Sequence, residues 1–382
     1  MRKTLLALAG VVPLAVALTL VATPAQAGVL VQVDAAGGEV VAGQYIVTLK
    51  SGAAATVAKA RGIAARHVYT KAVNGFAATL SGAQLRALQS DPSVASIERN
   101  QVIHLATTQS PTPSWGIDRI DQRTLPLSNS YTFTASGAGV TAYIIDTGIN
   151  PTHPDFGGRA AVAFDATGGN GVDCNGHGTH VAGTIGSASY GVAKSVALRG
   201  VRVLDCNGSG TFADVIEGID WVTANSPGPA VANLSLGGGK SSAVNNAVKN
   251  LSNSGVLVAV AAGNSAANAC NSSPSSEPTA VTVAASTITD ASASFTNFGR
   301  CVDLYAPGVD ITSTWLGNAT NTISGTSMAT PHVAGVAALY KSAFGDASSA
   351  TVTNFITGNA TAGVLTGVPR RTPNLLLFTN QL

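Results

Sequence analysis

The sequence predicts an α/β protein in which helices cover both faces of a mostly parallel sheet, preceded by a smaller α+β unit. Two observations support this prediction. From about residue 140 onward, apolar runs of strand length alternate with helical stretches, which is the order typical of a parallel sheet. Between residues 40 and 104, strand-like runs enclose two helical stretches, as in a small sheet with helices on one face.

Residues 1–27 are predicted to be a signal peptide. Met1-Arg2-Lys3 is followed by an apolar run from Leu5 to about Ala22 and then by Ala25-Gln26-Ala27. A charged head, a hydrophobic stretch and a small-residue cleavage site are typical of a secretory signal. The alternative is an uncleaved membrane anchor, but the prolines and the Ala-x-Ala end favour cleavage. We therefore expect a secreted, extracellular protein with no membrane segment after signal removal.

Residues 28–107 are predicted to form the smaller unit, with its folded part at about 40–104. Ser81 is a suitable N-cap for the second of its helices, and the polar, proline-bearing segment 101–115 indicates a linker. The predicted strands are 43–50, 73–80 and 94–98, and the predicted helices are 53–65 and 81–89.

Residues 108–382 are predicted to form one large α/β domain. Functional side chains in such a domain gather where the parallel strands end. An apolar, small-residue helix is also expected to begin at Ser327. The predicted strands are 140–145, 197–204, 230–236, 256–260 and 280–284, and the helices between them are 179–187, 212–224 and 242–254.

Charge and cysteine content exclude some functions. From Thr107 onward, 12 basic and 15 acidic residues leave a net charge of −3, so the chain has no basic stripe for nucleic acid. The four cysteines follow Thr107, and a secreted chain makes disulfides the default. Three pairings are possible. Loop closure favours the nearer partners, Cys174 with Cys206 and Cys270 with Cys301, and the C-x2-C spacing of common zinc sites is missing.

Several polar residues stand where an α/β domain places chemistry. Asp146 and Asn264 each follow a predicted strand, and Ser327 begins a helix, where unpaired backbone N–H groups stabilise negative charge. His177 lies between glycines at the start of another helix. Each has a simpler explanation, because aspartate and serine also cap turns and helices. His177 and His180 could bind a metal, but the His-Glu-x-x-His pattern is absent.

Taken together, these stretches resemble the subtilisin-like serine peptidases in the order Asp, His, Asn, Ser, and are most similar to the proteinase K branch with its secreted, aqualysin-type bacterial members. The supporting segments are 174–177, 203–210, 234–239 and 325–332. The resemblance implies a three-layer subtilisin-like fold for residues 108–382. For residues 28–107 it implies a ferredoxin-like propeptide that aids folding and inhibits its own peptidase. A monomer that acts on proteins and peptides is expected.

The resemblance also implies the roles of the residues. Ser327 would be the nucleophile, His177 the general base and acid, Asp146 the carboxylate that orients the imidazole, and Asn264 an oxyanion donor. His153 would be a surface residue near the Asp146 loop. We therefore expect a secreted serine endopeptidase of broad specificity that works through an acyl-enzyme without a catalytic cofactor. It would be made as a zymogen that cuts itself near residues 106–108. The alternative is a secreted, non-catalytic binding protein on the same fold.

Substrate and calcium sites follow from the same resemblance. A peptide is expected to add as a strand between two glycine-rich edges and to place an apolar side chain in a pocket with small walls. Oxygen-ligated calcium is expected to stabilise the fold, although ordinary surface charge is the alternative, and Ser128 stands where some relatives have an aspartate. The substrate residues are Gly208, Ser209, Gly210, Leu236, Gly237, Gly238, Ala261 and Gly263; the calcium ligands are Asp303 with the carbonyls of Pro278 and Ala280, and at a second site Asp118, Asp121 and Gln122.

Overall fold

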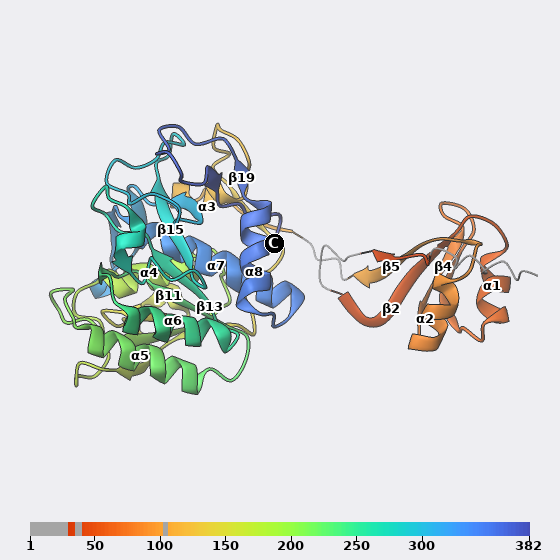
Figure 1. Cartoon of the computed structure of the whole chain (residues 1–382), viewed down its shortest axis with the longest axis horizontal. Coiled ribbons are helices and arrows are strands. Elements are labelled where there is room, and N and C mark those ends of the chain that lie inside the picture. The colour runs from red at the N-terminus through yellow and green to blue at the C-terminus, as the bar shows by residue number, and fades with distance from the viewer. Residues whose placement is uncertain (1–29, 35–39, 102–105) are drawn as a thin grey trace, which may run out of the picture. The chain divides into compact units, whose positions relative to one another are not determined.

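The chain folds into two compact units, shown in a computed structural model (Figure 1). The structure describes residues 30–34, 40–101 and 106–382, so the predicted signal peptide lies outside the described residues. Val41–Asn100 belongs to the first unit, and Gln101–Leu382 forms the second. Among the described residues, no helix has the length and apolar character needed to cross a membrane.

The first unit is a sheet with two helices, in the order β-α-β-β-α-β after a short leading strand. Its strands lie in the order β1-β5-β2-β4-β3, and Val47, Phe76, Leu88 and Ile97 are fully buried in its core. The elements are β1 (Val33–Asp34), β2 (Val40–Leu49), α1 (Ala54–Ala60), β3 (Ala65–Tyr69), β4 (Gly75–Thr79), α2 (Gly82–Gln89) and β5 (Val94–Gln101).

Strand β3 was not predicted, because the expected helix ran through its first residue. The helix α1 ends at Ala60, and the chain then pairs with β4 in an antiparallel ladder. Arg66, His67 and Val68 are exposed on this edge strand, so no alternation of buried and exposed residues marks it in the sequence. Helix α2 begins as predicted, with the Ser81 hydroxyl accepting from the Gln84 backbone in a capping box.

In the second unit, nine of the described strands form one sheet in the order β19-β20-β16-β15-β13-β11-β8-β10-β9. Every pairing in it is parallel except that of β19 with β20. Its strands are β8 (Thr141–Asp146), β9 (Ala160–Asp165), β10 (Ala197–Arg202), β11 (Ala230–Leu234), β13 (Leu257–Ala261), β15 (Val281–Ser286), β16 (Leu304–Pro307), β19 (Thr361–Ala362) and β20 (Leu375–Leu376).

Helices cover both faces of this sheet, as alternate residues of β8 show. Ala142 and Ile144 belong to the core cluster that includes buried residues of α4, α7 and α8. Tyr143 and Ile145 belong to the opposite cluster with α5 and α6. The helices are α3 (Trp115–Ile120), α4 (His177–Gly186), α5 (Phe212–Asn225), α6 (Ser242–Asn253), α7 (Thr326–Phe344) and α8 (Ser349–Asn359).

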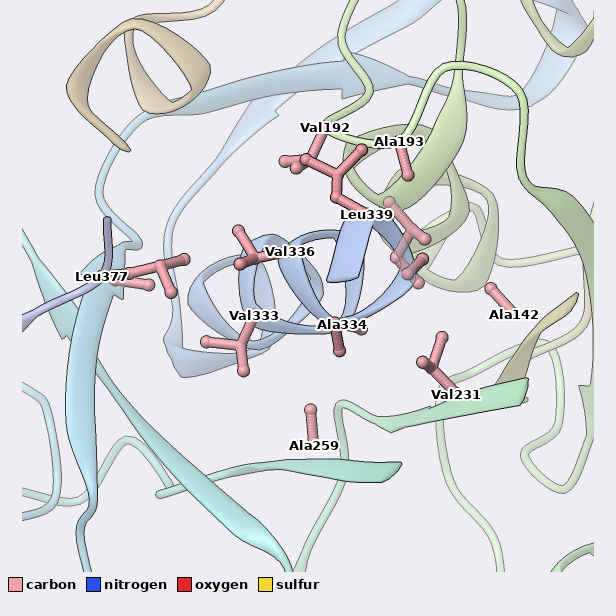
Figure 2. Packing of buried hydrophobic residues seen from close by; sticks show 14 of the residues in the cluster. Ala142, Val192, Ala193, Val231, Ala259, Val333, Ala334, Val336, Leu339 and Leu377 are labelled. Atoms are coloured by element: carbon pink, nitrogen blue, oxygen red, sulfur yellow. The ribbon is translucent and has the colours of Figure 1, made fainter. Parts of the chain in front are cut away.

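Helix α7 runs through the centre of the larger core, which fixes its first turn against the sheet. Figure 2 shows Val333 and Ala334 of this helix near Val231 and Ala259 of the sheet, with Val192 near the other side of the helix. Gly335 is needed at that contact, since an added Cβ would clash with Val192. The small side chains predicted for this helix therefore allow close packing.

Short strands and two disulfides complete the second unit. The strand β6 (Thr107–Gln109) pairs with β7 (Tyr131–Phe133), so part of the predicted linker is a strand of this unit. Cys174 bonds to Cys206 and Cys270 to Cys301, the pairing that loop closure favours. The other short strands are β12 (Gly238–Gly239), β14 (Ser272–Ser273), β17 (Ile311–Thr314) and β18 (Thr320–Ile323).

Candidate active site

Asp146 and His177 form a hydrogen-bonded pair at the end of the central strand β8. Asp146 is fully buried, and its Oδ1 lies 2.7 Å from Nδ1 of His177. The Thr147 backbone N–H donates to the same oxygen at 2.7 Å. A buried carboxylate bonded to Nδ1 fixes the histidine tautomer in which Nε2 is free to accept a proton.

The charges around His177 raise the pKa of its imidazole. Burial by itself lowers this pKa, but the charge and hydrogen bond of Asp146 and the charge of Asp173 together raise it above its usual value. His177 is the first residue of α4 and follows Gly176, whose backbone is left-handed. A Cβ on Gly176 would clash with the Trp315 ring. The glycine is therefore required for the close approach of this loop to Trp315.

Asp173, which the sequence analysis did not single out, organises the loop that carries His177. It is 5% exposed, and its Oδ1 accepts from the backbone N–H groups of Asn175 and Gly176 at 2.9 Å each. The Thr147 hydroxyl donates to the same oxygen at 2.9 Å, and Thr179 donates to Oδ2 through both its backbone N–H and its hydroxyl. Asp173 thus joins the first turn of α4 to the end of β8.

Ser327 is the second residue of α7, so its backbone N–H belongs to the first helical turn, where no intrahelical acceptor is available. Its hydroxyl donates to the Ser235 carbonyl at 3.2 Å. For Ser327 to act as a nucleophile, this hydroxyl must turn toward Nε2 of His177, a contact that often forms only when substrate binds. The Ser235 hydroxyl in turn donates to the Ser327 carbonyl at 2.8 Å.

Asn264 is held with its amide nitrogen as the available donor. Its Oδ1 accepts from the backbone N–H and the hydroxyl of Thr326, both at 2.8 Å. Since one amide oxygen takes both bonds, the amide nitrogen is left to bind an anion. Asn297 fixes the neighbouring loop by donating to the Ala262 carbonyl and accepting from the Ser265 and Ala267 backbones. Neither Thr326 nor Asn297 carries a sequence signal of this role.

Two adjoining clefts bring the predicted residues together. Asn264 and Ser327 line a cleft of about 320 Å³, together with residues 236–239 and Ala261 and Gly263. His177 lines a cleft of about 580 Å³, together with the predicted edge Gly208–Gly210. Leu236 and Gly237 line both clefts, so the two clefts adjoin as one groove, in which Ser327 lines the smaller part and His177 the larger. Every residue lining the smaller cleft is uncharged.

Among the described residues, the other histidines of the second unit are structural. His180 and His332 are fully buried, and burial lowers the pKa of each to about 4. Nε2 of His180 lies 3.0 Å from the Ile311 carbonyl, to which it donates, so this nitrogen is not available as a metal ligand beside His177. His153 was expected at the surface, but this prediction is wrong: its ring is buried, and Nδ1 accepts from the Asp155 backbone to cap a short turn.

The carboxylates expected to bind calcium are partly withdrawn from water. Asp303 is a half-buried carboxylate whose pKa is raised to about 6 by burial, although a hydrogen bond from the Thr282 backbone lowers it. At the second site, burial and the charge of Asp118 raise the pKa of Asp121 to about 6. Within the described chain, Oδ1 of Asp121 is buried without a hydrogen-bond partner. Carboxylates of this kind suit a hard cation.

Ser128 bonds two of the three residues expected at the second calcium site. Its backbone N–H and hydroxyl donate to Oδ1 of Asp118, and its backbone also donates to Oε1 of Gln122. The third expected ligand, Asp121, instead accepts through Oδ2 from the Thr132 backbone. Within the described residues, no group of three or more His, Cys, Asp or Glu side chains is placed to hold a metal ion.

Comparison with known proteins gives a consistent result. Residues 137–373 match the Subtilase family, and residues 44–106 match Peptidase inhibitor I9. The chain is 55% identical over 316 residues to the extracellular serine proteinase of Thermus sp. (strain Rt41A), which covers 82% of this chain and 77% of that protein. It is 45% identical over 380 residues to alkaline serine protease ver112 of Corniculantispora psalliotae, covering 97% and 98%. The solved structure of a cold adapted subtilisin-like serine proteinase matches with a TM-score of 0.68 at 51% identity, covering 71% of this chain and 99% of that one.

Proposed function

Because this chain belongs to the subtilase family and is a subtilisin-like serine endopeptidase, we propose that Ser327, His177 and Asp146 carry out its reaction. The observation that carries the proposal is the 2.7 Å hydrogen bond from Nδ1 of His177 to the buried carboxylate of Asp146, in the groove that Ser327 also lines. Serine needs a base to become a nucleophile, and the base needs a group that orients it.

In the first step, Nε2 of His177 takes the proton of the Ser327 hydroxyl as its oxygen attacks the peptide carbonyl. Asp146 stabilises the imidazolium that forms. The oxyanion accepts hydrogen bonds from the amide nitrogen of Asn264 and the backbone N–H of Ser327. His177 then gives its proton to the leaving amine, which leaves an acyl-enzyme on Ser327. A water molecule, deprotonated by His177, releases the second product and restores the serine.

The substrate peptide lies extended in the groove and adds as a strand between the Gly208–Gly210 and Leu236–Gly238 edges. Glycine at this edge also leaves room for the Phe212 ring, since a Cβ on Gly238 would come within 2.8 Å of it. The residue before the scissile bond enters the smaller cleft beside Ala261 and Gly263. Because the cleft walls carry no charge, the preferred side chains are apolar or aromatic, and specificity is broad.

The chain is made as a secreted precursor that removes its own inhibitor. Residues 1–27 act as the signal peptide, residues 28–107 as the propeptide and residues 108–382 as the peptidase, with the cut near residues 106–108. The match of residues 44–106 to an inhibitor family supports the propeptide role. The extracellular relative from Thermus supports secretion. The propeptide then blocks the groove until it is degraded.

Calcium stabilises the peptidase without taking part in the reaction. Asp303 with the carbonyls of Pro278 and Ala280 would hold one ion, and Asp118, Asp121 and Gln122 would hold a second, weaker one. The raised pKa values of Asp303 and Asp121 support these sites, since a bound cation would offset the cost of burying each carboxylate.

The test is hydrolysis of a succinyl-Ala-Ala-Pro-Phe anilide by purified wild type and Ser327→Ala, with intact masses recorded. Wild-type turnover at mature mass beside an inactive, uncut variant is expected. Ser324→Ala is the matched control, because this exposed serine of the same loop bonds only to Asp310 among the described residues. A folded wild type without turnover would favour the non-catalytic binding protein.

A further inference from the structure

We infer that Ser235 is a positioning residue for Ser327, because its hydroxyl supplies the hydrogen bond that a proline removes from the carbonyl of the nucleophile. This inference rests on the proposed role of Ser327. It concerns the Ser235 hydroxyl, whose bonds within the described residues go to the Ser327 carbonyl and the Asn233 amide and not to the Ser327 hydroxyl.

Pro331 lies inside α7, four positions after Ser327. In an α-helix the backbone N–H of residue 331 would donate to the carbonyl of residue 327, four positions earlier. Proline has no N–H, and its ring crowds that same carbonyl. Pro331 therefore leaves the Ser327 carbonyl without the backbone donor that it would have in a regular helix.

Ser235 provides a replacement donor from the end of strand β11. Its hydroxyl, on a residue only 4% exposed, donates to the Ser327 carbonyl at 2.8 Å. A hydroxyl has one hydrogen, so it must act as acceptor toward its other neighbour. That neighbour is the amide nitrogen of the fully buried Asn233, which donates at 2.9 Å. The relay therefore runs in one direction, from Asn233 through Ser235 to Ser327.

The hydrogen bonds from Asn233 to Ser235 and from Ser235 to Ser327 hold the proposed nucleophile in place. Ser235 contacts Ser327 twice, since its own carbonyl accepts from the Ser327 hydroxyl at 3.2 Å. Holding the Ser327 carbonyl fixes the peptide group that joins Ser327 to Met328. It thereby restrains the Ser327 Cα, from which the hydroxyl and the backbone N–H both extend. A displacement of about 1 Å at such a group lowers the rate roughly a hundredfold.

Ser235→Ala removes the donor while keeping the backbone that forms the groove. It leaves two buried groups without partners, the Ser327 carbonyl and the Asn233 amide. We expect kcat to fall roughly ten- to a hundredfold, with KM changed less than about threefold. The rate of labelling of Ser327 by a phosphonylating reagent should fall in parallel. Ser252→Ala is the matched control: this serine is 6% exposed and donates to the Thr279 carbonyl at 2.9 Å, and its loss should leave kcat unchanged.

A double-mutant cycle separates positioning from a general loss of stability. In a Pro331→Ala background, residue 331 regains its N–H and can bond the Ser327 carbonyl within the helix. Adding Ser235→Ala to that background should lower kcat by less than a third of the factor seen with proline present. An equal factor in both backgrounds, or a folded Ser235→Ala enzyme with wild-type kcat, would overturn the inference. An inactive wild type would instead overturn the proposed function.

Discussion

Replacing Asp173 by asparagine tests how the loop before α4 sets the chemistry of His177. The carboxylate accepts five hydrogen bonds, three on Oδ1 and two on Oδ2. An asparagine has a single side-chain oxygen, so at best it keeps the three hydrogen bonds now made to Oδ1. Its NH2 group would then face the backbone N–H and hydroxyl of Thr179, which are donors as well. Bonds to a charged group contribute about 1.5–3 kcal/mol each, so the loss is about 3–6 kcal/mol of unfolding free energy.

The same substitution should shift the pH dependence of activity. Three titratable groups act on His177: Asp146 from β8, Asp173 from the preceding loop and His180 from α4. The negative charge of Asp173 raises the pKa of His177, so removing it should lower that pKa. Since His177 must be neutral to act as base, the acidic limb of kcat/KM should move to lower pH.

The assay is kcat/KM against pH for mature wild type, Asp173→Asn and Asp165→Asn, with the thermal midpoint of each. Asp165 is a matched control, because it accepts backbone bonds from Thr167 and Gly171 in another loop and its charge is not among those acting on His177. Thr147→Val removes the hydroxyl that donates to Asp173 and accepts from the Gly178 backbone but keeps the Asp173 charge, so it should lower the thermal midpoint and leave the acidic limb in place. An acidic limb that stays in place or moves to higher pH in folded Asp173→Asn, or one that moves to lower pH in Thr147→Val, would refute the reasoning.

Three further predictions follow from the site and its supports. Asn264→Ala should lower kcat about 100- to 1000-fold with little change in KM, since it removes an oxyanion donor; an unchanged kcat would contradict that role. Chelation should lower the thermal midpoint of the wild type but have a smaller effect on Asp303→Asn, and equal shifts would argue against the Asp303 site. Replacing Cys270 and Cys301 by alanine opens a loop with a sequence separation of 31 and should cost about 4 kcal/mol, measured by denaturant unfolding; an unaltered unfolding curve would contradict it.

Much of the fold was predictable because its parallel strands are short apolar runs separated by amphipathic helices. The subtilisin-like fold and the serine-peptidase class expected from the sequence are confirmed by the comparisons. Strand β3 escaped prediction because an edge strand with exposed Arg66 and His67 has no apolar alternation. The position of His153 was wrong because burial of a polar ring depends on the turn it caps, which no local pattern reveals.

The residues proposed for catalysis could be proposed from the sequence because each stands at a strand end or a helix start. The residues that support them were not singled out. Asp173 and Thr326 lie in polar stretches where serine, threonine and aspartate are common, and Ser235 lies at the end of an apolar predicted strand, while the importance of all three lies in hydrogen bonds to residues distant in the chain. Ser235 and Ser327, for example, are separated by 92 positions. Such contacts depend on how α7 packs against the sheet, which residue spacing does not determine.

The most direct test of the proposed mechanism is to locate the nucleophile by chemical labelling. Mature enzyme is treated with a serine-directed phosphonylating reagent, digested and mapped by mass spectrometry, beside His177→Ala and a sample pretreated with a zinc chelator. We expect one adduct, on Ser327, formed at the same rate with or without chelator and far more slowly in the His177→Ala variant. An adduct on another residue, or no adduct on an enzyme that still cleaves peptides, would contradict it.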